Sequence, residues 1–264
     1  MWCVGAIFYL LLRRTDWFGP THATTQELQR SVWWRASLML ALYVLAFTFS
    51  LQFTSASHVA LYLGTSPVWA LLAEGGPRAT LDSLRRYVAA ALALSGLVIL
   101  FWPKLHTAEG NWRGDLLALG ASLLWTIYGR QCRDLAQSLS GAEITYATMW
   151  RAAAWLTPLA VWEVTQGGLV ISWSLVGVQA YCTIFGGVVS FALYNNALRH
   201  WPMSQVFLFS SLIPASTMIW AWLLLNEPVM RTFWVAMVLV ITGVVLGQLK
   251  HTPHATDQCP TPNK

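Results

Sequence analysis

The chain carries one stretch twice: residues 57–67 read SHVALYLGTSP, and residues 204–214, at an offset of 147, read SQVFLFSSLIP. Ser, Val, Leu and Pro coincide between the two copies. The same offset of 147 places Gly96 on Gly243, near the end of a later apolar run. A mid-segment proline and a late glycine therefore keep their spacing in both copies, which predicts an internal repeat.

Apolar residues dominate the composition. The chain is 56% hydrophobic and 10% charged, whereas an ordinary globular domain is about 25% charged. The apolar residues form blocks that, as helices rising 1.5 Å per residue, are suited to crossing about 30 Å of hydrocarbon. Backbone groups in lipid must be satisfied within the chain, so the expected fold class is an all-α polytopic membrane helix bundle. We expect spans at residues 1–12, 36–53, 57–76, 85–102, 114–135, 144–164, 172–197, 203–225 and 232–249.

The net charge of +5 follows the loops in a pattern typical of membrane topology. Loops on one side hold twelve basic residues: Arg13, Arg14, Arg30, Arg35, Arg78, Arg85, Arg86, Arg130, Arg133, Arg199, Lys250 and Lys264. Loops on the other side hold three: Lys104, Arg113 and Arg231. The positive-inside rule predicts a multi-pass protein of the plasma (inner) membrane with a cytoplasmic C-terminus. The basic charge is thus topological, and a nucleic-acid partner is not expected.

The repeat predicts the domain organisation. Residues 1–12 would rise only about 18 Å as a helix, too little for a full span. Subtracting 147 from span 114–135 gives positions before Met1, so we expect about nine spans of ten, with the first helix absent. The expected domains are a first repeat (1–103) lacking that helix, a second repeat (113–249) and a polar tail (250–264). Five spans per repeat is an odd number, which predicts an inverted repeat.

The second half carries several recognisable stretches. They are a small-residue helix ending in Trp125-x-x-Tyr128, the turn Tyr194-Asn195-Asn196-Ala197-Leu198-Arg199, a Pro214-bearing helix closing in Asn226-Glu227-Pro228, and a final Gly243-Val244-Val245-Leu246. These stretches resemble the EamA-type ten-helix members of the drug/metabolite transporter superfamily. In the first half, Thr65-Ser66-Pro67 resembles the family's Thr-x-Pro helix, and Thr80 stands opposite Glu227. The resemblance implies export or facilitated diffusion of small metabolites, often amino acids.

Arg151 is a candidate substrate-contact residue because it lies inside the apolar span 144–164. A charge at this depth costs at least about 2.5 kcal/mol on insertion scales, so it normally faces protein, water or a partner. Its guanidinium is suited to holding a substrate carboxylate in a bidentate manner. The alternative is that the side chain snorkels to the cytoplasmic edge, roughly 10 Å away.

Other candidates are polar, aromatic and proline residues inside the spans. Tyr194 and Asn195 are suited to hydrogen-bonding a substrate, or alternatively to holding helices together at about 0.6 kcal/mol for each bond. Trp125 is a candidate wall for a largely apolar pocket, with packing as the alternative. Pro67 and Pro214 each free a backbone carbonyl, and at matched positions of an inverted repeat we expect them to flank a central cavity.

The leading functional hypothesis is an integral membrane exporter of small metabolites such as amino acids, working by alternating access. The alternatives are an inactive truncated remnant and an intramembrane enzyme, although the sequence contains neither HExxH nor GxSxG. The four cysteines lack metal-binding spacing, so neither a metal nor a cofactor is expected. The expected partners are a small-molecule substrate and the lipid bilayer, and the oligomeric state is left open.

Overall fold

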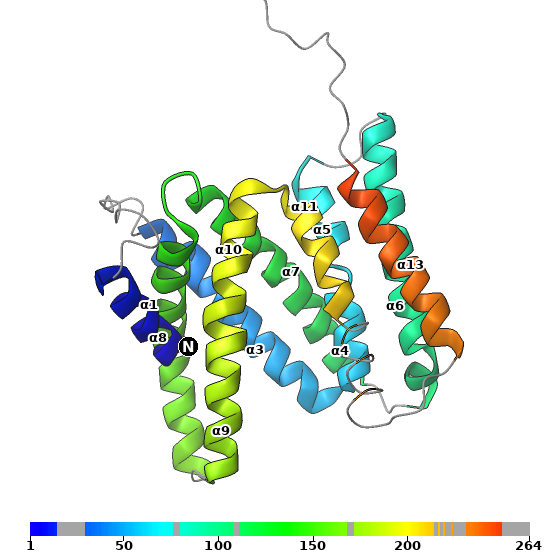
Figure 1. The fold of residues 1–264 in the computed structure, drawn as a ribbon. Coiled ribbons are helices and arrows are strands. Elements are labelled where there is room, and N and C mark those ends of the chain that lie inside the picture. The colour runs from blue at the N-terminus through cyan, green and yellow to red at the C-terminus, as the bar shows by residue number, and fades with distance from the viewer. Residues whose placement is uncertain are drawn as a thin grey trace, which may run out of the picture.

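The protein is a helix bundle. The structure, a computed structural model, describes residues 1–14, 30–75, 80–107, 111–167, 172–213, 216, 219, 223 and 231–249. Within these residues every regular element is a helix (Figure 1). The helices are α1 (Trp2–Arg14), η2 (Val32–Ser37), α3 (Leu38–Phe53), α4 (Ala56–Leu63), α5 (Ser66–Ala73), α6 (Leu81–Thr107), α7 (Trp112–Leu135), α8 (Gly141–Gly167), α9 (Trp173–Tyr181), η3 (Cys182–Val189), α10 (Ser190–His200), α11 (Met203–Ser210) and α13 (Arg231–Gln248).

Every predicted span contains one of these helices, so the predicted all-α bundle is confirmed. Two of the spans begin or pass through π-helical turns, in η2 and η3, which the apolar pattern did not predict. Pro214 and the predicted tail 250–264 lie outside the described residues.

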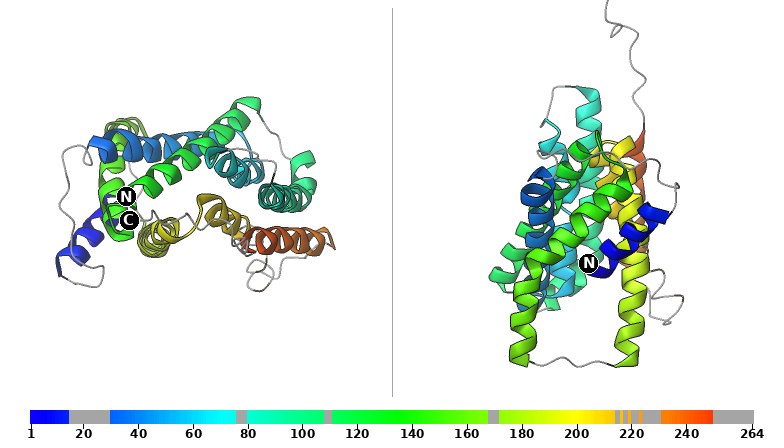
Figure 2. Two further views of the ribbon diagram at one scale, coloured as in Figure 1. Left: turned by 90° about the horizontal axis from the view of Figure 1, so that it is seen from above. Right: turned by 90° about the vertical axis from the view of Figure 1, so that its left-hand side faces the viewer.

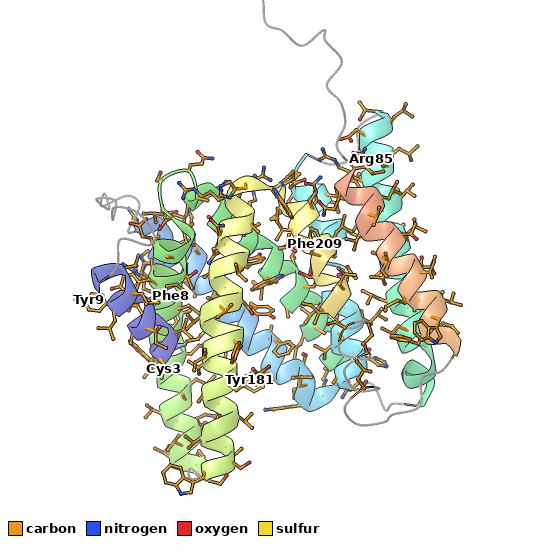
Figure 3. All side chains as sticks on the ribbon, viewed as in Figure 1. Cys3, Phe8, Tyr9, Arg85, Tyr181 and Phe209 are labelled. Carbon is orange, nitrogen blue, oxygen red and sulfur yellow. The ribbon has the colours of Figure 1, made fainter. Side chains whose placement is uncertain are left out.

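The helices pack in pairs. Helix α3 packs against α7, α1 against α8, and α6 against α13. Seen from above, α10, α11 and α13 stand in a row across from α3 (Figure 2). On α1, Phe8 is fully buried on the side that faces α8, whereas Tyr9 lies on the outer side (Figure 3).

The outer surface of the bundle is apolar. Three helical stretches are long and apolar enough to cross a membrane, judged by length and composition: Val32–Phe53, Leu81–Leu100 and Trp173–His200. On α13, Val238 and Val245 are more than half exposed, while Val240 on another face is buried. A helix that is apolar on all faces is typical of a membrane span, because lipid contacts its outer side.

Close packing between α6 and α13 depends on two glycines that the sequence offset had paired. A Cβ atom on Gly96 would lie 2.7 Å from Val240 Cγ2 and 2.8 Å from the Ala236 carbonyl oxygen. A Cβ atom on Gly243 would lie 2.6 Å from the Ala89 carbonyl oxygen and 2.8 Å from the Ala93 backbone nitrogen. Ala89 and Ala236 are 147 positions apart, as are Ala93 and Val240. The two contacts are therefore reciprocal, and they keep the register of the repeat.

We expect Gly96→Ala and Gly243→Ala each to destabilise the protein by about 1–3 kcal/mol, since the added methyl group would force α6 and α13 apart. The measurement is thermal unfolding in detergent, followed by intrinsic fluorescence. Gly120→Ala on α7 is the matched control, because no atom lies within 4 Å of a Cβ built there. That variant should match or exceed the parent, as alanine favours a helix over glycine. Loss of stability in only one of the two interface variants would contradict the reciprocal packing.

Candidate functional site

The span predicted at 57–76 is broken in its middle. Helix α4 ends at Leu63 and α5 begins at Ser66. Pro67 lies in the first turn of α5, and it has no N–H to donate to the Leu63 carbonyl four residues earlier. The Ser66 hydroxyl donates to that carbonyl instead, at 2.5 Å. The break is thus stabilised by a side chain that stands next to the proline.

The matched span in the second half breaks at the matched position. Helix α11 covers Met203–Ser210, which is α4 displaced by 147 residues. The residue that follows α11 is Ser211, with φ −67° and ψ −15°. The residue that follows α4 is Gly64, with φ −63° and ψ −12°. The two helices therefore end with the same backbone geometry.

A cavity of about 230 Å³ lies beside these two breaks. Its lining includes four pairs of residues separated by 147 positions: Ala60 with Phe207, Leu63 with Ser210, Gly64 with Ser211, and Ser66 with Ile213. Tyr43, Pro67, Leu97 and Trp125 complete the lining among the described residues. The stretch 57–67 contributes five lining residues and the stretch 204–214 contributes four described ones, so the cavity lies where the two copies meet.

Aromatic rings form one wall of this cavity. The Trp125 ring lies 4.9 Å from the ring of Tyr43 and 5.0 Å from that of Tyr194, measured between centroids. Phe207 stacks at 6.4 Å from Trp125 and at 6.2 Å from Tyr194. The hydroxyl group of Tyr194 is buried, and it has no hydrogen-bond partner among the described residues. Trp125 is thus the centre of the wall, with Tyr194 immediately behind it.

Hydroxyl groups supply the polarity of the cavity. The Ser122 Oγ atom lies 3.0 Å from Thr65 Oγ1 and 3.1 Å from Ser66 Oγ, which links α7 to the break. Trp69 Nε1 donates to Thr65 Oγ1 at 3.0 Å. Ser211 differs from these residues, because its buried Oγ atom has no partner within the described part of the chain. No charged residue appears among the described residues that line this cavity.

The site residues predicted from the sequence lie in different parts of the structure. Trp125 and Pro67 line the cavity, and Tyr194 stacks on Trp125. Asn195 is fully buried between α10 and α8, where its Nδ2 atom donates to Thr145 Oγ1 at 2.8 Å. Pro214 lies outside the described residues, although its neighbour Ile213 lines the cavity.

Arg151 lies apart from the cavity. Its Nη1 atom donates to the Ala147 carbonyl at 3.0 Å. Its guanidinium carbon lies 4.4 Å from the ring centroid of Trp150 and 5.8 Å from that of Trp33. These cation–π contacts and the carbonyl stabilise a half-buried charge without a carboxylate. None of its three contacts lines the cavity.

Several cavity residues were not predicted as site residues, among them Ser211 and Phe207. The signal was available, because both belong to the repeated stretch that also contains Pro214. A broken helix exposes the residues just before and after its break, so the positions on both sides of the proline are candidate site residues. Tyr43 gave no such signal, since it lies in an uninterrupted apolar run.

Comparison with known proteins identifies the class. The EamA-like transporter family model matches residues 112–247. This match covers just over half of the chain, and the chain therefore belongs to that family of integral membrane transporters of small molecules. The match begins at the first residue of α7 and ends within α13. No curated protein sequence matches the chain.

The fold also matches solved structures. One of them, described as "Crystal structure of protein", is 14% identical, with a TM-score of 0.68 over 94% of this chain and 84% of that chain. At this level of identity the likeness concerns the fold alone, and it agrees with an all-α polytopic membrane bundle.

Two serines that line the cavity should differ in their structural roles. Ser66→Ala removes the donor to the Leu63 carbonyl and the contact with Ser122, so we expect a loss of about 1–3 kcal/mol. Ser211→Ala removes a hydroxyl group that has no partner within the described residues, so stability should be unchanged or slightly higher. Thermal unfolding of the two variants in detergent measures the difference. Equal losses would mean that Ser211 has a structural partner.

Proposed function

We propose that the protein exports small metabolites by alternating access, with the substrate bound in the cavity between the two repeated stretches. The cavity lining carries this proposal, because its four residue pairs are related by the offset of 147. Transporters built from inverted repeats bind substrate at the repeat interface, typically at discontinuous helices. The breaks that follow α4 and α11, with a cavity lined from both repeated stretches, support the proposal.

We also propose the arrangement of the halves and their orientation. Residues 1–103 and 113–249 would be two inverted repeats, and 250–264 a tail in the cytoplasm of a cell whose plasma (inner) membrane holds the protein. The reciprocal packing of Gly96 and Gly243 supports the pairing of the halves. The loop charges, twelve basic residues against three, support the orientation. Membership of a transporter family argues against the hypothesis of an intramembrane enzyme.

The chemistry of the cavity favours an amphipathic substrate. An apolar part of the molecule would lie against the Trp125 ring, and a hydrogen-bonding group would reach the unpartnered Ser211 hydroxyl. Because no charged residue lines the described cavity, charged groups of a substrate would have to be neutralised within the substrate or remain hydrated. Zwitterionic amino acids satisfy this condition and are the first substrates to test.

The roles of Arg151 and Asn195 are separate proposals. If Arg151 holds a substrate carboxylate, the substrate must leave the cavity and reach the side of α8 that faces Trp33. If Asn195 contacts substrate, it must do so through its Oδ1 atom, which has no partner among the described residues, since Nδ2 is engaged by Thr145. We propose that Trp125 and Ser211 contribute more to substrate binding than either of these.

We expect Trp125→Ala and Ser211→Ala to reduce transport in liposomes loaded with labelled amino acids. The loss for Ser211→Ala should be about tenfold in apparent affinity, which corresponds to roughly 1.4 kcal/mol for a buried hydrogen bond. The loss for Trp125→Ala should be larger, because an aromatic wall is removed.

Two matched controls carry the same substitutions on the outer surface. Trp162→Ala changes an exposed tryptophan on α8, and Ser95→Ala changes a serine on the exposed side of α6. Both should transport like the parent. Transport that falls with Arg151→Ala and Asn195→Ala but survives Trp125→Ala and Ser211→Ala would place the substrate outside the cavity and contradict the proposal.

A further inference from the structure

Four groups from three helices converge on the carboxylate of Glu74, the residue that follows α5. Arg133 Nη1 donates to Glu74 Oε1 at 3.0 Å. The Ser204 backbone N–H donates to the same oxygen at 3.1 Å, and Ser204 Oγ donates to Glu74 Oε2 at 2.7 Å. Arg86 Nη1 lies 3.8 Å from Oε2. Glu74 thus accepts from α7 and α11 and pairs with α6.

These contacts cross the boundary between the proposed halves. Glu74 and Arg86 belong to residues 1–103, whereas Arg133 and Ser204 belong to residues 113–249. Ser204 lies in the first turn of α11, where the backbone N–H groups have no helical partner and a carboxylate is favourable. Both side chains of the Glu74–Arg133 pair are partly exposed, so water screens their attraction. The hydrogen-bond geometry and the neighbouring groups on α6 and α11 therefore stabilise the pair.

The cluster stands in line with the cavity on the same helices. Glu74 follows the cavity residue Ser66 by eight positions on α5, and Arg133 follows Trp125 by eight positions on α7. Eight helical residues rise about 12 Å. On α11, Ser204 lies one turn before the cavity residue Phe207. Three helices that line the cavity therefore meet again at the ion pair, towards the end of the bundle that carries Arg85 (Figure 3).

Buried side chains lie between the cavity and the ion pair on α5 and α7, and others flank Ser204 on α11. Ala70, Tyr128 and Phe207 have no exposed surface, and Met203 is 2% exposed. All four belong to one cluster of buried residues. We call these four residues the plug. A solute in the cavity would have to separate them in order to reach the ion pair.

A second cavity lies on the far side of the plug. It measures about 360 Å³ and is lined by Ala73, Glu74, Arg86, Arg130, Arg133, Asp134, Pro202 and Met203. It shares no described lining residue with the first cavity. Along α5 and α7 the first cavity and then the plug come before the ion pair, and the ion pair forms part of the lining of the second cavity.

We infer that Glu74, paired with Arg133 and Ser204, is the gate that closes the substrate cavity towards the arginine-rich end of the bundle. This inference rests on the proposed function, because a gate requires a transported solute. To open, α5 must move away from α7 and α11, which breaks every contact of Glu74 that crosses the halves. To close, the carboxylate returns to the start of α11 and the plug repacks.

The gate carboxylate comes from the first half only, so the gate is asymmetric. Position 221, which the offset of 147 pairs with Glu74, is an alanine. The opposite end of α7 is tied differently: Asp115 accepts from Thr54 Oγ1 at 2.9 Å and lies 3.1 Å from His58 Nδ1. Two ends with different chemistry allow the two sides of a transporter to open separately, which alternating access requires.

The test is the rate at which a cysteine in the cavity reacts with a water-soluble, charged thiol reagent. Cys3, Cys132, Cys182 and Cys259 are first replaced, and Ser210→Cys supplies the single thiol in the first cavity. The reagent is applied to each face of membrane vesicles in turn. Glu74→Gln and Arg133→Ala should each speed the reaction at least tenfold from the arginine-rich face and leave the rate from the other face unchanged.

Asp82→Asn is the matched control. Asp82 is a carboxylate near the same end that pairs with Arg85 and Arg86 inside α6. Among the described residues it meets the gate through Arg86, which belongs to the same half, so its loss leaves the contacts of Glu74 with Arg133 and Ser204 in place. Its loss should leave the labelling rate within twofold of the parent. The exchange Glu74→Arg with Arg133→Glu should slow the reaction again relative to either single variant, provided that the variants elute from size exclusion as the parent does.

Unchanged labelling in Glu74→Gln and Arg133→Ala, or equal acceleration by Asp82→Asn, would overturn the gate. Labelling requires no substrate, so this outcome is independent of the transport assay. A protein that transports normally with unchanged labelling would keep the proposed function and lose the gate. Faster labelling in a protein that transports none of the tested amino acids would keep the gate and remove those substrates.

Discussion

Backbone polar groups inside a membrane must find hydrogen-bond partners within the protein, and this requirement determines where a broken helix can lie. At the break between α4 and α5, side chains supply the missing partners. Ser66 Oγ donates to the Leu63 carbonyl, and Thr65 Oγ1 donates to the Tyr62 carbonyl at 2.6 Å. The irregular backbone then faces a cavity rather than lipid. The cavity lies beside these breaks, and three of the helices that line it, α5, α7 and α11, also meet at the proposed gate.

The cavity is lined by residue pairs that the offset of 147 relates. Its aromatic and polar groups come from pairs whose two members differ. The matched residues Ala60 and Phe207 differ in size, so the second half contributes a ring where the first contributes a methyl group. Gly64 is matched by Ser211, whose hydroxyl group has no described partner. Glu74 has no carboxylate counterpart at position 221. The repeat therefore determines the position of the proposed site. The positions at which the two copies differ determine which groups line the cavity and which end carries the proposed gate.

Most of the fold could be predicted from the sequence, because long apolar blocks in a membrane have helix as their main solution. The offset also predicted that Gly96 and Gly243 are equivalent, and their contacts are reciprocal. The π-helical turns η2 and η3 could not be predicted, since they change hydrogen bonding without changing the apolar pattern. Pro67 and Trp125 could be predicted as cavity residues, because a proline frees a backbone carbonyl and a binding pocket is largely apolar. The environment of Arg151 could not be predicted from the sequence: two tryptophan rings and a carbonyl stabilise its charge away from the cavity, and its contact with substrate stays a prediction.

Glu74 was not predicted as a site residue, because the offset of 147 pairs Glu227 with Thr80. Thr80 caps α6 through the Ser83 N–H at 3.2 Å, whereas Glu74 follows α5 just before Gly75, whose φ of 125° suits glycine.

We propose that substrate binds between the two helix breaks, and an experimental structure with a transported substrate bound would test this. We expect ligand density in the cavity, with its apolar part against the Trp125 ring and a polar atom within hydrogen-bond distance of Ser211 Oγ. Density held by the Arg151 guanidinium on α8, with the cavity empty, would contradict it.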